Sequence, residues 1–164
     1  MTVTDITTDV EARTLVVTTR FDAPVERVWQ LWADPRQLER WWGPPTYPAT
    51  FVAHDLRPGG AVSYFMTGPE GDRHHGWWTI TAVDAPHRLE LDDGFADQEG
   101  NPNPELPVTQ MRVDIAADGD ATQMVITSTY PSTEAMEQVL AMGMVEGITA
   151  ALGQIEAILA DVAA

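Results

Sequence analysis

The chain has 164 residues, with 25 acidic side chains against nine arginines, no lysine and no cysteine, and its formal net charge is −16. The lack of cysteine excludes disulfides, thiol nucleophiles and thiolate metal sites. The strong negative charge argues against partners such as nucleic acid or anionic membranes, because both are bound through Lys and Arg. With no secretory signal and no apolar run long enough to cross a membrane, we expect a soluble, cytoplasmic protein of one domain.

The N-terminal part predicts a tail, a strand and two helices. Residues 1–12 lack an apolar period, so we expect a flexible tail ahead of a single domain over residues 13–164. Apolar and β-branched residues alternate along residues 13–21, which predicts a strand. Pro24 and Pro35 each follow a capping position and begin two short helices in tandem, which end before Gly43.

A run of six further strands follows, without helices between them. The candidates span residues 48–55, 61–67, 75–83, 88–92, 107–115 and 122–130. The short gaps carry turn residues, so antiparallel hairpins are favoured over crossovers. Residues 93–107 are the exception, because they are too polar and too rich in Gly and Pro for a strand. We expect a solvated acidic loop there.

A single long helix is predicted from Ser132 to Val162, where apolar residues recur with a period of 3.6 residues. Gly143 and Gly147 lie on this apolar stripe, and each costs about 1 kcal/mol relative to Ala in a helix. We expect close packing of a neighbouring element at these glycines, with room for a guest molecule as the alternative.

The order of elements predicts an α+β domain in which a curved seven-stranded antiparallel sheet buries one face against the long helix. A straight helix does not fill a concave sheet, so a cavity is expected between them. The alternation of the strands and the helical period select its candidate lining: Trp42, Val62, Tyr64, Met66, Trp78, Met111, Met124, Met136, Leu140, Met144 and Ile148. Methionine adapts to varied ligand shapes but also fills cores, and the tryptophans could simply close the ends of the core, so both interpretations stay open.

A series of short motifs carries a family resemblance. In order they are Phe21-Asp22-Ala23-Pro24, Val28-Trp29, Trp41-Trp42-Gly43-Pro44, Asp55-x-Arg57-x-Gly59-Gly60, Met66-x-x-Pro69-x-Gly71, Gly76 and Pro86-x-Arg88-Leu89. Over residues 13–161 the chain resembles the bacterial proteins similar to the C-terminal domain of the activator of the Hsp90 ATPase. That resemblance implies the helix-grip fold of the START-like (SRPBCC, Bet v 1-like) superfamily, with two short helices and a long C-terminal helix over a cavity.

The resemblance implies three functions. The first is binding of a small hydrophobic molecule between the sheet and the C-terminal helix; the alternatives are a polyketide cyclase or aromatase using the same cavity, and a co-chaperone-like interaction module. No nucleophile–base series is present, so no catalytic residue is assigned, although Tyr64 with Arg112 or His75 could serve if they point inward.

No cofactor motif and no regular metal-ligand spacing are present, so neither a cofactor nor a metal is expected. His74 and His75 are adjacent in a strand and therefore point to opposite faces. A homodimer through an apolar tip of the acidic loop, at Phe95 and Pro104, is a further option.

Overall fold

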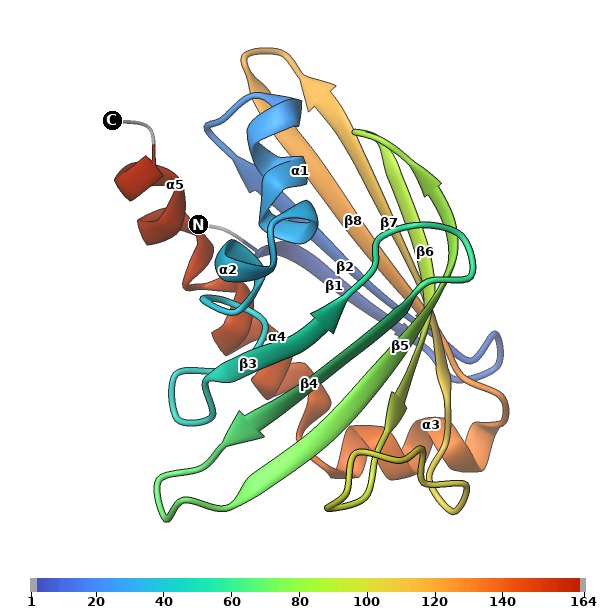
Figure 1. The fold of residues 1–164 in the computed structure, drawn as a ribbon. Helices are drawn as coiled ribbons and strands as arrows, with labels where there is room; N and C mark the ends of the chain where they lie inside the picture. Colours follow the sequence, from blue (N-terminus) through green and yellow to red (C-terminus); the bar gives the residue numbers. More distant parts are fainter. Residues whose placement is uncertain (1–2, 163–164) are drawn as a thin grey trace.

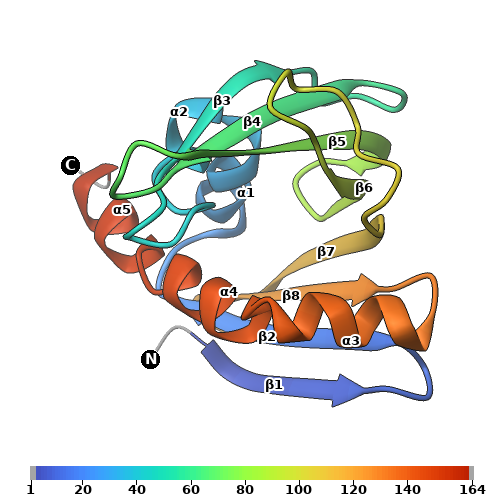
Figure 2. The same ribbon diagram turned by 90° about the horizontal axis from the view of Figure 1, so that it is seen from below.

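The computed structural model describes residues 3–162, in which eight strands form one antiparallel sheet in the order β1-β2-β8-β7-β6-β5-β4-β3. The strands are β1 (Val3–Asp9), β2 (Thr14–Phe21), β3 (Ala49–His54), β4 (Ala61–Thr67), β5 (Arg73–Asp84), β6 (Arg88–Phe95), β7 (Thr109–Asp118) and β8 (Ala121–Thr129). The sheet is strongly curved, so that its two ends face each other with the helices between and across them (Figures 1 and 2). This is the predicted α+β helix-grip architecture, with one more strand than expected.

The additional strand is β1, which lies in the segment expected to be a flexible tail. It pairs with β2 in antiparallel register, for example Ile6 with Val17. Most of its side chains are exposed, so it is held mainly by backbone hydrogen bonds and carries little of the hydrophobic alternation on which the prediction depended. The first two residues of the predicted tail and the last two of the predicted domain lie outside the described residues.

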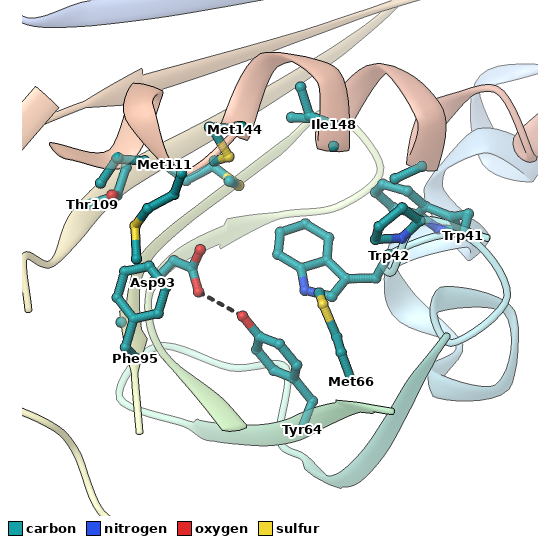
Figure 3. Close-up of a pocket in the computed structure, with 17 residues that line it drawn as sticks. Trp41, Trp42, Tyr64, Met66, Asp93, Phe95, Thr109, Met111, Met144 and Ile148 are labelled. Atoms are coloured by element: carbon teal, nitrogen blue, oxygen red, sulfur yellow. Dashed lines mark hydrogen bonds between the residues drawn. The ribbon is translucent and has the colours of Figure 1, made fainter. Parts of the chain in front are cut away.

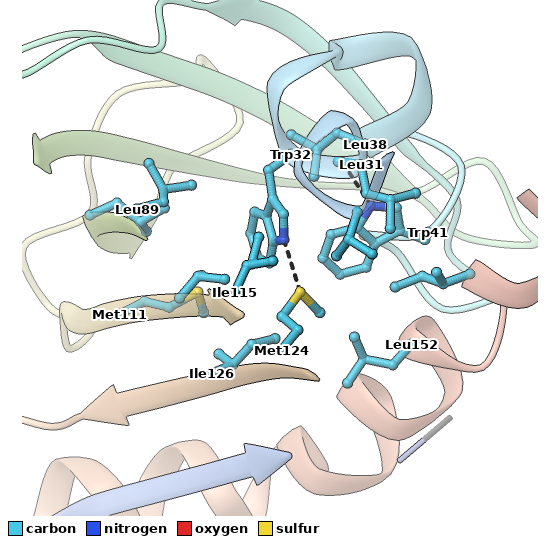
Figure 4. Packing of buried hydrophobic residues seen from close by; sticks show 14 of the residues in the cluster. Leu31, Trp32, Leu38, Trp41, Leu89, Met111, Ile115, Met124, Ile126 and Leu152 are labelled. Atoms are coloured by element: carbon cyan, nitrogen blue, oxygen red, sulfur yellow. Dashed lines mark hydrogen bonds between the residues drawn. The ribbon is translucent and has the colours of Figure 1, made fainter. Parts of the chain in front are cut away.

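Two short helices follow β2, as predicted, and close one end of the curved sheet (Figure 1). They are α1 (Val25–Ala33) and α2 (Pro35–Leu38), and the Asp34 side chain caps α2 by accepting a hydrogen bond from the Arg36 amide. Trp32 on α1 is fully buried and donates its Nε1–H to Met124 Sδ at 3.2 Å (Figure 4). Trp41 follows α2 and donates its Nε1–H to the Leu31 carbonyl at 2.9 Å. The core of the domain therefore lies under these two helices.

The C-terminal helix is broken into three pieces where one continuous helix was predicted. They are α3 (Thr133–Ala141), α4 (Met144–Leu152) and α5 (Ile155–Val162). The first break is at Gly143, whose φ of 86° is the left-handed conformation that ends helices. The second break follows Gly153, where Gln154 Nε2 donates to the Gly43 carbonyl at 2.7 Å. The apolar period continues across both breaks, which is why the sequence pattern did not reveal them.

Among the described residues, no single helix is long and apolar enough to cross a membrane. The segments Thr133–Ala141 and Met144–Ala160 reach that length and composition only together, and they are bent by 61° at the break.

Candidate functional site

A pocket of about 290 Å³ lies between the curved sheet and the broken C-terminal helix (Figure 3). Its 17 described lining residues come from the segment after α2, from β4, β6 and β7, and from α3, α4 and the break between them. Of these residues, only Tyr64, Asp93 and Thr109 contribute a hydroxyl or carboxyl group. The pocket is therefore mostly apolar, with a few polar groups in defined places, as is typical of small-molecule sites.

Six of the eleven predicted lining residues border this pocket. They are Trp42, Tyr64, Met66, Met111, Met144 and Ile148. Three methionines are thus brought together from β4, β7 and α4, and Trp42 reaches into the same space from the loop after α2 (Figure 3).

The other five predicted residues are absent from the described lining. Val62 and Met136 are almost completely buried in the core, and Met124 lies beneath Trp32. Trp78 is also buried and packs edge-on behind Trp42, with the ring centroids 4.9 Å apart. Leu140 is half-buried and packs against the core cluster. For the first four of these side chains the structure favours the alternative interpretation, that they fill the core.

The polar centre of the pocket is a pair formed by Tyr64 and Asp93. Tyr64 Oη donates a hydrogen bond to Asp93 Oδ1 at 3.0 Å (Figure 3). Tyr64 is on β4 and Asp93 is on β6, so the tyrosine ring must cross β5 to reach the carboxyl group. It crosses at Gly76, which pairs with Tyr64 in the ladder, and a Cβ atom at that position would overlap the Tyr64 ring. Gly76 thus leaves the space that lets the pair form.

Burial shifts the pKa values of this pair upward. Loss of hydration, only partly opposed by the nearby Tyr64 hydroxyl and Trp78 indole, raises the pKa of Asp93 to about 7. Burial, together with the negative charge of Asp93, raises the pKa of Tyr64 well above its ordinary value. Burial and the same charge raise the pKa of Tyr130 to about 12. Asp93 can therefore exist in both protonation states near neutral pH, whereas the tyrosines stay neutral.

Three buried donors lie around this pair without a hydrogen-bond partner among the described residues. They are Trp42 Nε1, Trp78 Nε1 and Tyr130 Oη. Asp93 Oδ2 also forms no hydrogen bond with the described residues, and Asp93 keeps a part of its surface open at the pocket. Since the three donors are covered, it is at Asp93 that a bound molecule could add a polar contact.

Asp93 was missed by the sequence analysis, which ended the strand at residue 92 and assigned Asp93 to a solvated loop. The structure extends β6 to Phe95. The run Asp92-Asp93-Gly94 is unfavourable in strands and resembles a turn. The continued alternation of Leu89, Leu91, Asp93 and Phe95 was the signal that could have placed Asp93 on the inner face.

The proposed partners of Tyr64 do not reach the pocket. Arg112 is exposed on β7 and pairs with Asp114 at 2.8 Å. The ring of His75 lies against Phe65, with centroids 5.5 Å apart. Phe95, expected at the tip of a dimerising loop, lines the pocket instead.

The glycines of the C-terminal helix leave room in place of close packing. Gly147 borders the pocket, and a Cβ atom there would meet nothing within 4 Å. Gly143 also borders it and provides the helix break. The expectation that a neighbouring element packs closely at these two positions is therefore wrong.

No three His, Asp or Glu side chains within residues 3–162 are grouped so that they could hold a metal ion. The functional groups that line the pocket are the carboxyl group of Asp93 and the hydroxyl groups of Tyr64 and Thr109, within a large apolar surface.

The sequence matches a family model. Residues 22–160 fit the family described as activator of Hsp90 ATPase homolog 1-like protein. Among curated proteins, none matches the sequence.

Solved structures share both fold and sequence with the chain. A crystal structure of a protein from Mycobacterium smegmatis is 52% identical, with a TM-score of 0.89 and 96% of each chain covered. A solution NMR structure of a protein from Arthrobacter aurescens is 49% identical, with a TM-score of 0.94, covering 98% of this chain and 93% of that one. DynU16, a protein of the dynemicin biosynthetic locus, is 19% identical with a TM-score of 0.62, covers 88% of this chain and 47% of its own, and shares the fold alone.

Proposed function

The chain belongs to the family of activator of Hsp90 ATPase homolog 1-like proteins. From that premise we propose that it binds a small, mostly apolar molecule in the pocket between its sheet and its C-terminal helix. The observation that carries the proposal is the pocket itself, whose apolar walls surround one hydrogen-bonded carboxyl–tyrosine pair. Apolar walls supply affinity by removing surface from water, and a few fixed polar groups supply orientation.

The size of the pocket limits the ligand. An apolar cavity of roughly 150 Å³ holds one benzene ring. The pocket of about 290 Å³ therefore suits a molecule of one or two rings, or a short chain of similar volume. The methionines at 66, 111 and 144 have flexible, polarisable side chains, which would let the walls adjust to ligands of different outline.

A matched pair of variants at Gly147 tests the proposal. A leucine side chain at this position would project into open space at the pocket wall, whereas alanine would add one methyl group. We expect wild type and Gly147→Ala to bind naphthalene-sized probes, detected by quenching of tryptophan fluorescence because Trp41 and Trp42 line the site. Gly147→Leu should weaken binding by at least about tenfold, equivalent to about 1.4 kcal/mol.

Native mass spectrometry with a panel of apolar compounds gives the second readout. If no compound binds the wild-type chain by either method, or if Gly147→Leu binds the probes as tightly as Gly147→Ala, the proposed function is wrong. Circular dichroism of both variants checks that the fold is retained.

The Asp93–Tyr64 pair favours a second candidate function, general acid–base catalysis on the bound molecule. A carboxyl group with a pKa of about 7 can accept and return a proton at neutral pH. The fitting reaction class is proton abstraction from a carbon next to a carbonyl group: the proton passes to Asp93, the C–H electron pair forms a C=C bond, and the π pair of the carbonyl group moves to its oxygen.

This second function predicts that the protein accelerates exchange of the α-hydrogens of β-tetralone in D2O, measured by NMR against buffer alone. We expect Asp93→Asn to reduce the accelerated rate by at least about 100-fold, the lower range of general-base contributions. Exchange at the buffer rate with wild type, when β-tetralone is shown to bind, would eliminate this function and leave binding.

A further inference from the structure

The carboxyl group of Asp93 has no positively charged partner within residues 3–162, and this limits what the pocket can hold. None of the 17 described lining residues is Arg, Lys or His, and Asp93 is the one carboxyl group among them. The titratable side chain that faces it across the pocket is Tyr64, and Tyr130, which follows β8, is the other group whose pKa the Asp93 charge raises. Both are neutral near pH 7. A buried carboxylate without a counter-charge is unfavourable, and a ligand cation would offset a part of that cost.

The hydrogen-bond geometry leaves one oxygen for a ligand. Oδ1 accepts from Tyr64 Oη, whereas no hydrogen bond joins Oδ2 to the described residues, although the Trp78 indole lies near enough to the carboxyl group to lower its pKa. The carboxyl group points into the space bordered by Trp42, Tyr64 and Phe95 (Figure 3). The unpartnered indole N–H groups of Trp42 and Trp78 are completely buried, so a molecule in the pocket cannot reach them unless these rings move. At Asp93 the open contact in the ionised form is therefore an acceptor, which selects a donor on the ligand.

Two further features favour a charged donor over a neutral one. Aromatic rings at 41, 42, 64 and 95 line the pocket, and their π faces attract cations most strongly where water is excluded. The chain also carries a net charge of −16, and so negative a molecule attracts cations and repels anions over its surface. A ligand carboxylate would meet the Asp93 charge directly.

We propose that the ligand is a lipophilic amine, with an apolar body of one or two rings and one protonated nitrogen that donates a hydrogen bond to Asp93 Oδ2. The proposal rests on the proposed binding function and adds the ligand class to it. The ammonium group and Tyr64 Oη would then bind the two oxygens of the same carboxylate, and the ring system would lie against the methionines and aromatic rings.

Two probes with the same ring system test the charge. Naphthylmethylamine and naphthylmethanol differ only in the donor group, and their affinities can be measured by isothermal titration calorimetry at about pH 8, where Asp93 is mostly ionised. We expect the amine to bind at least about tenfold more tightly than the alcohol, as one charge-assisted hydrogen bond would produce. Equal affinities, or tighter binding of the alcohol, would overturn the ligand class while leaving the binding function intact. Absence of binding by both probes and by every other apolar compound would instead overturn the binding function.

The Asp93→Asn variant tests the residue. We expect it to bind the amine at least about tenfold more weakly and to change the affinity for the alcohol less than about threefold. Asp92→Asn is the matched control, because it removes the same charge from the next residue of β6, on the opposite face of the strand. Loss of amine binding in Asp92→Asn equal to that in Asp93→Asn would assign the effect to overall charge and overturn the proposal.

A pH series on the wild-type chain gives the same test without a substitution. As the pH falls from about 8 to about 5.5, Asp93 takes up a proton while the amine stays charged, so amine affinity should fall by about tenfold or more. Alcohol affinity should change much less. Amine binding that is independent of pH, or that strengthens on acidification, contradicts the proposal.

Discussion

Asp93 occupies its buried position because three strands cooperate around it. Tyr64 on β4 supplies the hydrogen bond, Gly76 on β5 leaves the tyrosine ring room, and Asp93 itself extends the inner face of β6. The hydrogen bond offsets only a part of the cost of removing the carboxylate from water, so the neutral acid is the favoured form over a wide pH range.

The raised pKa of Asp93 makes a prediction about stability. The folded-state value is about 7 against an ordinary value of 3.8, so between these values the folded chain holds a proton that the unfolded chain has lost. The contribution of Asp93 to the free energy of unfolding should therefore decrease as the pH rises from about 4 to about 7, by up to about 1.4 kcal/mol per pH unit.

Urea unfolding of wild type and Asp93→Asn across this pH range measures the effect, because the variant lacks the titrating group. We expect the variant to gain stability relative to wild type with each step toward pH 7. A difference that stays constant with pH would mean that Asp93 titrates at an ordinary value. Asp92→Asn again serves as the control for charge.

At the scale of elements, the sequence predicted the architecture well. Each of the seven predicted strands, from the first at residues 13–21 to the last at residues 122–130, agrees with one of the strands β2 to β8 to within three residues at each end. The agreement arises because each strand carries alternation or β-branched residues between turn signals. β1 escaped detection because Thr and Asp dominate it and its stability comes from pairing with β2. Local pattern does not report backbone hydrogen bonds to a distant strand.

The candidate site was less predictable than the fold for the same kind of reason. Alternation identifies the inner face of a strand but not how deep a side chain lies under its neighbours. The sequence therefore predicted both Met124 and Met111 as pocket-lining residues. The contact of Met124 with Trp32 places it in the core, whereas Met111 borders the pocket. The Tyr64–Asp93 pair joins β4 to β6 and depends on Gly76 in β5, which lies between them. These three residues are far apart in the sequence, so no local pattern contains all of them.

Two glycines of the broken helix should respond oppositely to alanine. Gly143 has a φ of 86°, so Gly143→Ala should destabilise the chain by about 1 to 2 kcal/mol. Gly147 lies inside α4 with free space at its Cβ position, so Gly147→Ala should stabilise the chain by up to about 1 kcal/mol. Chemical unfolding of both variants measures these changes. Stabilisation by Gly143→Ala would show that the helix is continuous in solution.

At the scale of the whole molecule, the excess of negative charge acts on stability as well as on ligands. Ion pairs such as Arg20–Asp118 and Arg88–Asp114 are partly exposed to solvent and contribute little. The remaining carboxylates repel one another in the compact state, and salt screens that repulsion.

The melting temperature should therefore rise by several degrees between low salt and about 0.3 M NaCl at about pH 8, where the carboxylates are ionised. Differential scanning fluorimetry provides the measurement, and a series in a neutral osmolyte separates screening from general solute effects. A melting temperature that falls with added NaCl would mean that attractive pairs outweigh repulsion.

Three of the seven described residues that line the helical side of the pocket, Gly143, Gly147 and Ala151, have little or no side chain. Substitution at these positions can only reduce the volume of the pocket, since almost any replacement adds atoms to the wall. At these three positions the pocket is therefore already near the largest volume that the backbone allows. Homologous chains with larger residues at these three positions would have to enclose smaller molecules. The residues at these positions should therefore predict the size of the ligand across the family.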